Sequence, residues 1–116
     1  MPDPSNVQFR VLRRETGLVQ EDIAYLLGLK GPSSVSRFER LSREPDIRSA
    51  LACEHILGAP VRTLFEPIFR EIGTVVRDRA RERLDALKAL AHDARHAQRL
   101  THLFKLAEQP PTLFDV

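Results

Sequence analysis

The sequence has no tryptophan, one tyrosine and a single cysteine, Cys53, among its 116 residues. One cysteine cannot form a disulfide within the chain, which fits a reducing compartment. No apolar run approaches the roughly 18 residues that a membrane-spanning helix needs, and no basic, apolar leader opens the sequence. We therefore expect a cytoplasmic protein without a membrane partner.

Strand signals are also scarce. Alternating runs of β-branched and aromatic residues, which are typical of strands, are almost absent, while the good helix formers Leu, Ala, Arg and Glu dominate. The sequence therefore predicts an all-α protein.

Motifs of catalysis and metal binding are missing. The sequence contains no glycine-rich phosphate loop, nucleophile elbow or pair of catalytic carboxylates, so we expect no enzyme, no catalytic residue and no cofactor. Cys53 lies in a helical pattern and is interpreted as a buried, inert thiol; a nucleophile is the less favoured alternative. His92 and His96 are four residues apart, near Asp93 and His102, but lack an HExxH motif or a cysteine partner. We interpret them as solvated helix residues.

Glycine, proline and aspartate divide the first part of the chain into five short helices. After a flexible lead at residues 1–5, we expect helices over 6–16, 20–27, 32 onward, 47–57 and 61–66. Gly17, Gly28 and Gly58 end three of them, because glycine adopts the left-handed conformation that closes a helix. Gly31 is expected to cap the third helix, with Pro32 at its first position, and Asp46 to cap the fourth.

Apolar spacing predicts the side chains that these helices bury. The expected buried residues are Ile23, Ala24, Leu26 and Leu27 in the second helix, Val35 and Phe38 in the third, Ile47, Ala50, Leu51, Cys53 and Leu57 in the fourth, and Val61, Leu64 and Phe65 in the fifth.

The pattern changes at residues 67–107. Apolar residues recur there at spacings of three and four, with arginines and acids between them, which predicts one long amphipathic helix or two, broken near Gly73 or around residues 95–99. Such a stripe must be buried on the first domain or on a second copy of the chain. Our candidates for a homodimer interface are Ile72, Val76, Leu84, Leu87, Ala91 and Leu103. Residues 108–116 are expected to be a proline-broken tail.

The charge distribution is more informative than the formal net charge of +2. Lys30, Arg37, Arg40 and Arg43 are opposed between residues 30 and 43 only by Glu39, which makes a local basic patch. Three serines lie in the same segment, GPSSVSRFER, on the early turns of the third helix. Serine adds little to helix stability, so these positions suggest a role other than folding.

The arrangement over residues 6–66 resembles the lambda-repressor-like (Cro/C1-type, XRE family) helix-turn-helix DNA-binding domain. The resemblance is carried by the runs GLVQEDIAYLLGL, SSVSRFER and EPDIRSALACEHILGAPVRTLF. It implies a five-helix domain, followed here by a C-terminal helical extension, whose third helix enters the major groove of double-stranded DNA.

The resemblance also implies roles for individual residues. Arg37 would read base edges, because its guanidinium can reach guanine O6 and N7 together. Ser33, Ser34 and Ser36 would be further base contacts. Contacts to phosphate are implied for Gln20, Lys30, Arg40 and Arg43, which orient the protein without reading sequence. Arg13 and Glu39 match a structural pair of the family.

Three features depart from the family pattern. The turn from Gly28 to Val35 is one residue longer than usual, which could change the base that each side chain reaches. Val19 stands where a serine or threonine cap is normal, at a cost of about 1 kcal/mol. Glu54 occupies a position where a small apolar residue is usual, so either it is paired or its helix is rotated.

These features predict a sequence-specific transcription regulator, a repressor, that binds a pseudo-palindromic operator as a dimer and is associated with the nucleoid. Two alternatives stay open. One is an antitoxin that represses its own operon and blocks a toxin through the extension. The other is an adaptor that binds no DNA and captures a partner helix on its amphipathic stripe.

Overall fold

The computed structural model describes residues 6–90 and 93–110, which form seven helices and no strand. The all-α prediction is therefore confirmed for these residues. The chain divides into two compact units, Met1–Pro67 and Ile68–Val116. The expected flexible lead, Ala91, His92 and most of the expected tail lie outside the described residues.

The first unit contains five helices, close to the predicted ranges. They are α1 (Val7–Thr16), α2 (Gln20–Leu27), α3 (Ser33–Glu39), α4 (Ile47–Leu57) and α5 (Val61–Leu64). Gly17, Gly28 and Gly58 follow α1, α2 and α4 with φ angles of 80°, 76° and 71°, as predicted. Asp46 caps α4 by accepting a hydrogen bond from the Ser49 backbone N–H at 2.7 Å, and this bond lowers the pKa of Asp46.

The start of α3 differs slightly from the prediction. The helix begins at Ser33, so Pro32 takes the capping position rather than Gly31. The Pro32 carbonyl accepts the Ser36 N–H at 2.9 Å. Proline suits this place because the residue that caps a helix needs only its carbonyl for the first helical bond.

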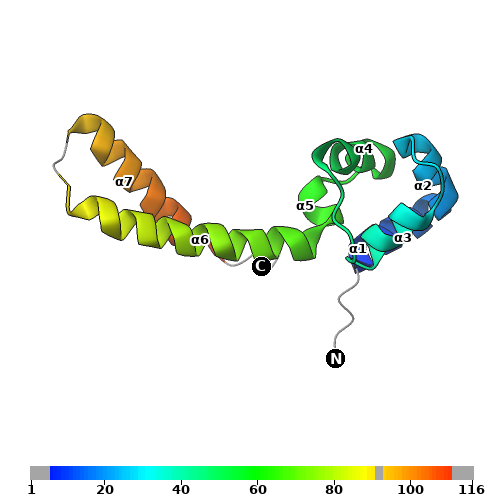
Figure 1. Cartoon of the computed structure of the whole chain (residues 1–116), viewed down its shortest axis with the longest axis horizontal. Helices are drawn as coiled ribbons and strands as arrows, with labels where there is room; N and C mark the ends of the chain where they lie inside the picture. Colours follow the sequence, from blue (N-terminus) through cyan, green and yellow to red (C-terminus); the bar gives the residue numbers. More distant parts are fainter. Residues whose placement is uncertain (1–5, 91–92, 111–116) are drawn as a thin grey trace, which may run out of the picture. The chain divides into compact units, whose positions relative to one another are not determined.

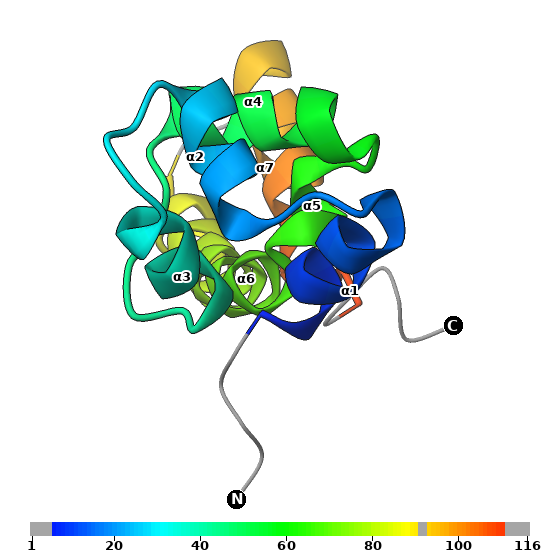
Figure 2. The same ribbon diagram turned by 90° about the vertical axis from the view of Figure 1, so that its right-hand side faces the viewer.

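The core of the first unit lies between α1 and the other four helices, which are seen together in Figures 1 and 2. Its fully buried apolar side chains are Phe9, Ile23, Val35, Cys53 and Leu64. The ring of Phe9 in α1 lies 5.6 Å from that of Phe65 at the end of α5, centroid to centroid. These contacts join the first helix to the last helix of the unit.

Three leucine and isoleucine positions expected in this core are exposed. Leu26, Ile47 and Leu51 are 55%, 75% and 50% exposed, so their predicted burial is wrong. Burial in α2 follows Ile23 and Ala24, and in α4 it follows Ala50, Cys53 and Leu57. Neighbouring helices cover only a narrow stripe of each of these short helices. The apolar residues extend beyond that stripe, so those outside it stay exposed.

The second unit is a helical hairpin of α6 (Glu66–Lys88), which begins just before the unit boundary, and α7 (Ala94–Ala107). Figure 1 shows α7 running back along α6. The extension is therefore two helices, but the break lies between Lys88 and Ala94 and not at either predicted place. Gly73 lies inside α6.

Two hydrogen bonds stabilise the turn of the hairpin. The Asp93 carboxylate accepts the His96 backbone N–H at 2.8 Å, which caps α7. The Nε2 atom of His96 lies 3.0 Å from the carbonyl oxygen of Leu87, near the end of α6. A carbonyl oxygen can only accept, so Nε2 carries the proton in this contact.

The hairpin buries Ala80, Leu84 and Leu87 of α6 together with His96 and Ala107 of α7. The interpretation of His96 as a solvated residue is therefore wrong, since its ring is bound to the Leu87 carbonyl. Its open end is joined by Arg81, which donates to the Glu108 carboxylate at 2.7 Å, and by Arg77, which donates to the Gln109 carbonyl at 3.4 Å. The bond to Glu108 raises the pKa of Arg81. The first residues of the expected tail are thus held against α6.

We expect Asp93→Ala to weaken the start of α7 by about 1 kcal/mol, because the variant loses its capping oxygen. Hydrogen exchange of the amides in the first turn of α7 should accelerate by about fivefold. Asp85→Ala is the matched control, since Asp85 is an exposed carboxylate that lies 4.0 Å from the Lys88 ammonium. Equal acceleration in both variants would show that charge, and not the cap, is responsible.

Candidate nucleic-acid interface

Helix α3 is anchored along one side and open along the other. Val35, Phe38 and Glu39 are 0%, 4% and 3% exposed, and α3 contacts both α1 and α2. Val35 and Phe38 are three residues apart, so they point to the same side of the helix. The side with Ser33 and Arg37 is left to solvent.

The buried Glu39 carboxylate fixes the end of α3. Its Oε1 atom accepts from Arg13 Nε of α1 at 2.5 Å, and its Oε2 atom accepts from Gln20 Nε2 of α2 at 2.7 Å. Arg13 also donates to the Leu18 carbonyl at 3.0 Å. One carboxylate thereby joins three helices and the loop between the first two, with both of its oxygens used.

The backbone of Glu39 adds a fourth connection. Its carbonyl accepts the N–H of Asn6, which caps α1, at 2.7 Å. The Asn6 side chain is fully buried, and neither of its polar atoms has a partner among the described residues. The predicted helix over residues 6–16 gave no role to the buried Asn6 side chain.

The four expected base contacts lie on α3 but differ in exposure. Ser33 and Arg37 are exposed, whereas Ser34 and Ser36 are half-buried. Ser34 is moreover occupied, because its hydroxyl accepts from Arg43 Nη1 at 3.3 Å. The side chains most open to an incoming ligand are therefore Ser33 and Arg37.

The expected phosphate contacts separate into two groups. Lys30, Arg40 and Arg43 are exposed around α3. Gln20 is half-buried, and its amide is bound to Glu39. Only its remaining N–H and its Oε1 atom are left for a phosphate or water, so the structure gives Gln20 a structural contact that the sequence analysis did not assign.

The turn after α3 brings Arg43 back toward the start of the helix. Leu41 has a φ angle of 56°, a left-handed conformation that is uncommon for a branched residue. The Leu41 N–H donates to the Phe38 carbonyl at 3.2 Å, and the Ser42 N–H donates to the Arg37 carbonyl at 3.0 Å. This closes the helix as a glycine normally would. The sequence carries no signal for it.

The helix before α3 ends in a tight turn. The Leu29 N–H donates to the Ala24 carbonyl at 2.8 Å and the Gly28 N–H donates to the Tyr25 carbonyl at 3.0 Å, which is the Schellman arrangement. At the other end of α2, Val19 supplies no side-chain cap, but its own N–H donates to the Asp22 carboxylate at 3.0 Å.

The unusual Glu54 is paired. It is exposed on α4, and its Oε1 atom accepts the Val61 N–H at 2.9 Å. The residue that precedes α5 is Pro60, which has no capping side chain. Glu54 therefore caps α5 from a neighbouring helix, where a carboxylate also favours the positive end of the helix dipole.

The dimer-interface candidates are divided by the hairpin. Leu84 and Leu87 are 4% and 3% exposed inside the chain's own second unit, so in this arrangement they offer no surface to another copy. Leu103 is half-buried, and Ala91 lies outside the described residues. Ile72 and Val76 remain available, at 54% and 43% exposure.

The described residues give little support for a metal site, a membrane-spanning helix or a cysteine nucleophile. Within residues 6–90 and 93–110, no three His, Cys, Asp or Glu side chains gather as a metal site would require, and no helix is long and apolar enough to cross a membrane. Cys53 is fully buried, and loss of water around it raises the pKa of its thiol to about 11. This environment disfavours the thiolate that a nucleophile needs.

In comparisons with known proteins, no family model, curated protein or solved structure matches this chain significantly.

We expect removal of one partner of the Arg13–Glu39 pair to cost more than removal of both. Glu39→Leu leaves a buried guanidinium without its anion and should lower the unfolding free energy by about 3–5 kcal/mol, and Arg13→Met is the other single variant. The double variant Arg13→Met/Glu39→Leu should recover most of that loss. Urea unfolding of the four proteins of the cycle measures this. Additive losses would show that the two side chains are not coupled.

Proposed function

We propose that this chain is a sequence-specific, DNA-binding transcription regulator, with α3 as the helix that enters the major groove. One observation carries the proposal. Between residues 30 and 43 the only acid, Glu39, is buried against Arg13, so the exposed charges of this segment are all positive. A fixed helix with an exclusively basic outward side suits a polyanion.

Arg37 is the proposed base reader. It is exposed on the open side of α3, and a guanidinium can bind guanine O6 and N7 together, which is worth about 1–3 kcal/mol of discrimination. Ser33, also exposed, is a second base contact. Ser34 and Ser36 are assigned supporting roles because they lie closer to the core.

Phosphate contacts are proposed for Lys30, Arg40 and Arg43. All three are exposed; Lys30 precedes α3 in the sequence, and Arg40 and Arg43 follow it. Contacts from these residues to phosphate would orient α3 on the DNA without specifying bases. Gln20 is kept as a phosphate contact through its unused amide N–H, in addition to its bond with Glu39.

The lambda-repressor-like family assignment is part of the proposal. It is supported by the order of five short helices, the turn at Gly28 and the contact between Arg13 and Glu39. The regulator is proposed to repress transcription and to bind a pseudo-palindromic operator as a dimer, with half-sites about one helical turn apart.

A protein-interaction role is the second candidate, either as an adaptor or as an antitoxin. The observation that favours it is a set of exposed apolar side chains in the second unit: Phe69, Ile72, Val75, Val76 and Phe104. A partner protein could cover these side chains as well as a second copy could.

The DNA-binding proposal is tested with Arg37→Ala. Fluorescence anisotropy would follow binding to a duplex from the region upstream of the protein's own gene and to a scrambled duplex, over a range of salt concentrations. We expect the wild type to prefer the upstream duplex, and Arg37→Ala to lose roughly tenfold or more of that preference while keeping non-specific binding.

Arg62→Ala is the matched control for this test, because it removes the same charge from an exposed position on α5. It should leave the preference unchanged. If the wild type binds neither duplex at low salt, DNA binding is wrong and the search moves to a protein partner. Equal loss of preference in both variants would contradict base reading by Arg37.

The dimer is tested through the exposed apolar pair on α6. Ile72→Asp/Val76→Asp should convert a dimer into a monomer at micromolar concentration, because a buried unpaired carboxylate is costly. Light scattering gives the mass. Glu71→Lys, a change on another side of α6, is the control; a wild type that is monomeric both alone and on DNA would contradict the proposed dimer.

A further inference from the structure

The arginines on the two sides of the α6–α7 hairpin differ in their pairing. On one side, Arg81 is bound to Glu108 and Arg77 to the Gln109 carbonyl. On the other side lie Arg79 and Arg83 of α6, and Arg95 and Arg99 of α7, all exposed. Within the described part of the chain, no ion pair joins any of these four arginines to a carboxylate.

The sequence explains why Arg83 and Arg99 stay unpaired. On a helix, the positions three and four residues away are neighbours on the surface. For Arg83 they hold Arg79, Ala80, Ala86 and Leu87, and for Arg99 they hold Arg95, His96, His102 and Leu103. Neither set contains an acid, whereas Arg81 has both Asp78 and Asp85 at these distances.

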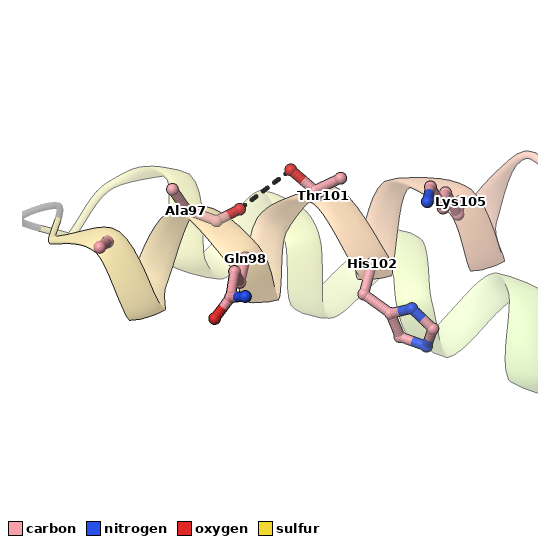
Figure 3. Close-up of a pocket in the computed structure, with 6 residues that line it drawn as sticks. Ala97, Gln98, Thr101, His102 and Lys105 are labelled. Atoms are coloured by element: carbon pink, nitrogen blue, oxygen red, sulfur yellow. Dashed lines mark hydrogen bonds between the residues drawn. The ribbon is translucent and has the colours of Figure 1, made fainter.

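Three of these arginines, Arg83, Arg95 and Arg99, share one hollow in the surface. Arg83, Arg95 and Arg99 line it together with Gln98, His102 and Leu103, over a volume of about 420 Å³. Arg79 and Arg83 line its continuation toward the open end of the hairpin. Gln98 and His102 also line a neighbouring pocket along α7, which is drawn in Figure 3, and there both side chains extend from the same side of the helix.

We propose that this arginine side of the hairpin, defined by Arg79, Arg83, Arg95 and Arg99, binds the phosphate backbone of nucleic acid. Four exposed guanidinium groups from two helices concentrate positive charge on one side of the hairpin, which attracts anions. Arginine is also the side chain whose planar fork matches the oxygens of phosphate. An open surface with several exposed cations suits a continuous polyanion better than a small ligand.

The inference rests on the proposed DNA-binding function but adds a second surface to it. Contacts of this kind carry no sequence information, so they strengthen binding to every duplex alike. The base-reading role of α3 and the phosphate-binding role of the hairpin can therefore be separated by experiment.

The test compares the full-length wild type with Arg83→Gln/Arg99→Gln on the upstream and scrambled duplexes. The logarithm of affinity falls with the logarithm of salt concentration by about 0.9 for each phosphate contact. Loss of two contacts should make that slope shallower by about 1.8 on both duplexes, while the preference for the upstream duplex stays at the wild-type value. Circular dichroism checks that the variant is folded.

Lys88→Gln/Lys105→Gln is the matched control, because it removes the same charge from exposed hairpin positions outside the hollow. A wild-type slope in the arginine variant, or an equal loss of slope in the lysine variant, would overturn the inference and leave the function of α3 standing. Poly-glutamate that binds the wild type as tightly as the scrambled duplex, and with the same dependence on Arg83 and Arg99, would overturn the assignment to nucleic acid.

The experiment can also support phosphate binding by the hairpin while contradicting base reading by α3. If the wild type binds both duplexes equally, and the arginine variant still loses about 1.8 units of slope, the hairpin inference is supported while sequence-specific recognition by α3 is not. Absence of binding to any duplex at low salt would overturn both.

Discussion

The Glu39 carboxylate accepts hydrogen bonds from side chains of two other helices, Arg13 in α1 and Gln20 in α2. Every position on α3 depends on this contact, because α3 has only seven residues and could not hold its orientation by helix propensity alone. Val35 and Phe38 bury its apolar side, but apolar contacts are not directional. The charged hydrogen bonds set the rotation and register of the helix.

The same contact determines the charge that α3 presents to solvent. A carboxylate on the open side would partly cancel Arg37 and Arg40, whereas the buried Glu39 is neutralised by Arg13. A network that stabilises the fold thus also leaves the exposed segment wholly basic. This connection explains why a modest net charge of +2 is compatible with a locally strong basic surface.

Much of the first unit could be predicted because single glycine and aspartate residues determine where several of its helices begin and end. Gly17, Gly28 and Gly58 fix the ends of three helices, and Asp46 fixes a start. The exposure of Leu26, Ile47 and Leu51 could not be predicted, since burial depends on which neighbours cover a helix and not on its own period. The left-handed Leu41 could not be predicted either, because glycine or asparagine is the residue that normally closes a helix in this way.

The position of the break between α6 and α7 was predicted wrongly, although the sequence contains a residue that indicates it. Asp93 is a good capping residue, and its position predicts a helix start that the apolar spacing from residue 67 to 107 conceals. Once the chain turns at that point, Leu84 and Leu87 are buried within the hairpin. The turn also brings Arg95 and Arg99 back beside Arg83, so residues separated in sequence become one charged surface. The break that lets α7 bury Leu84 and Leu87 is therefore the same feature that creates the arginine side of the hairpin.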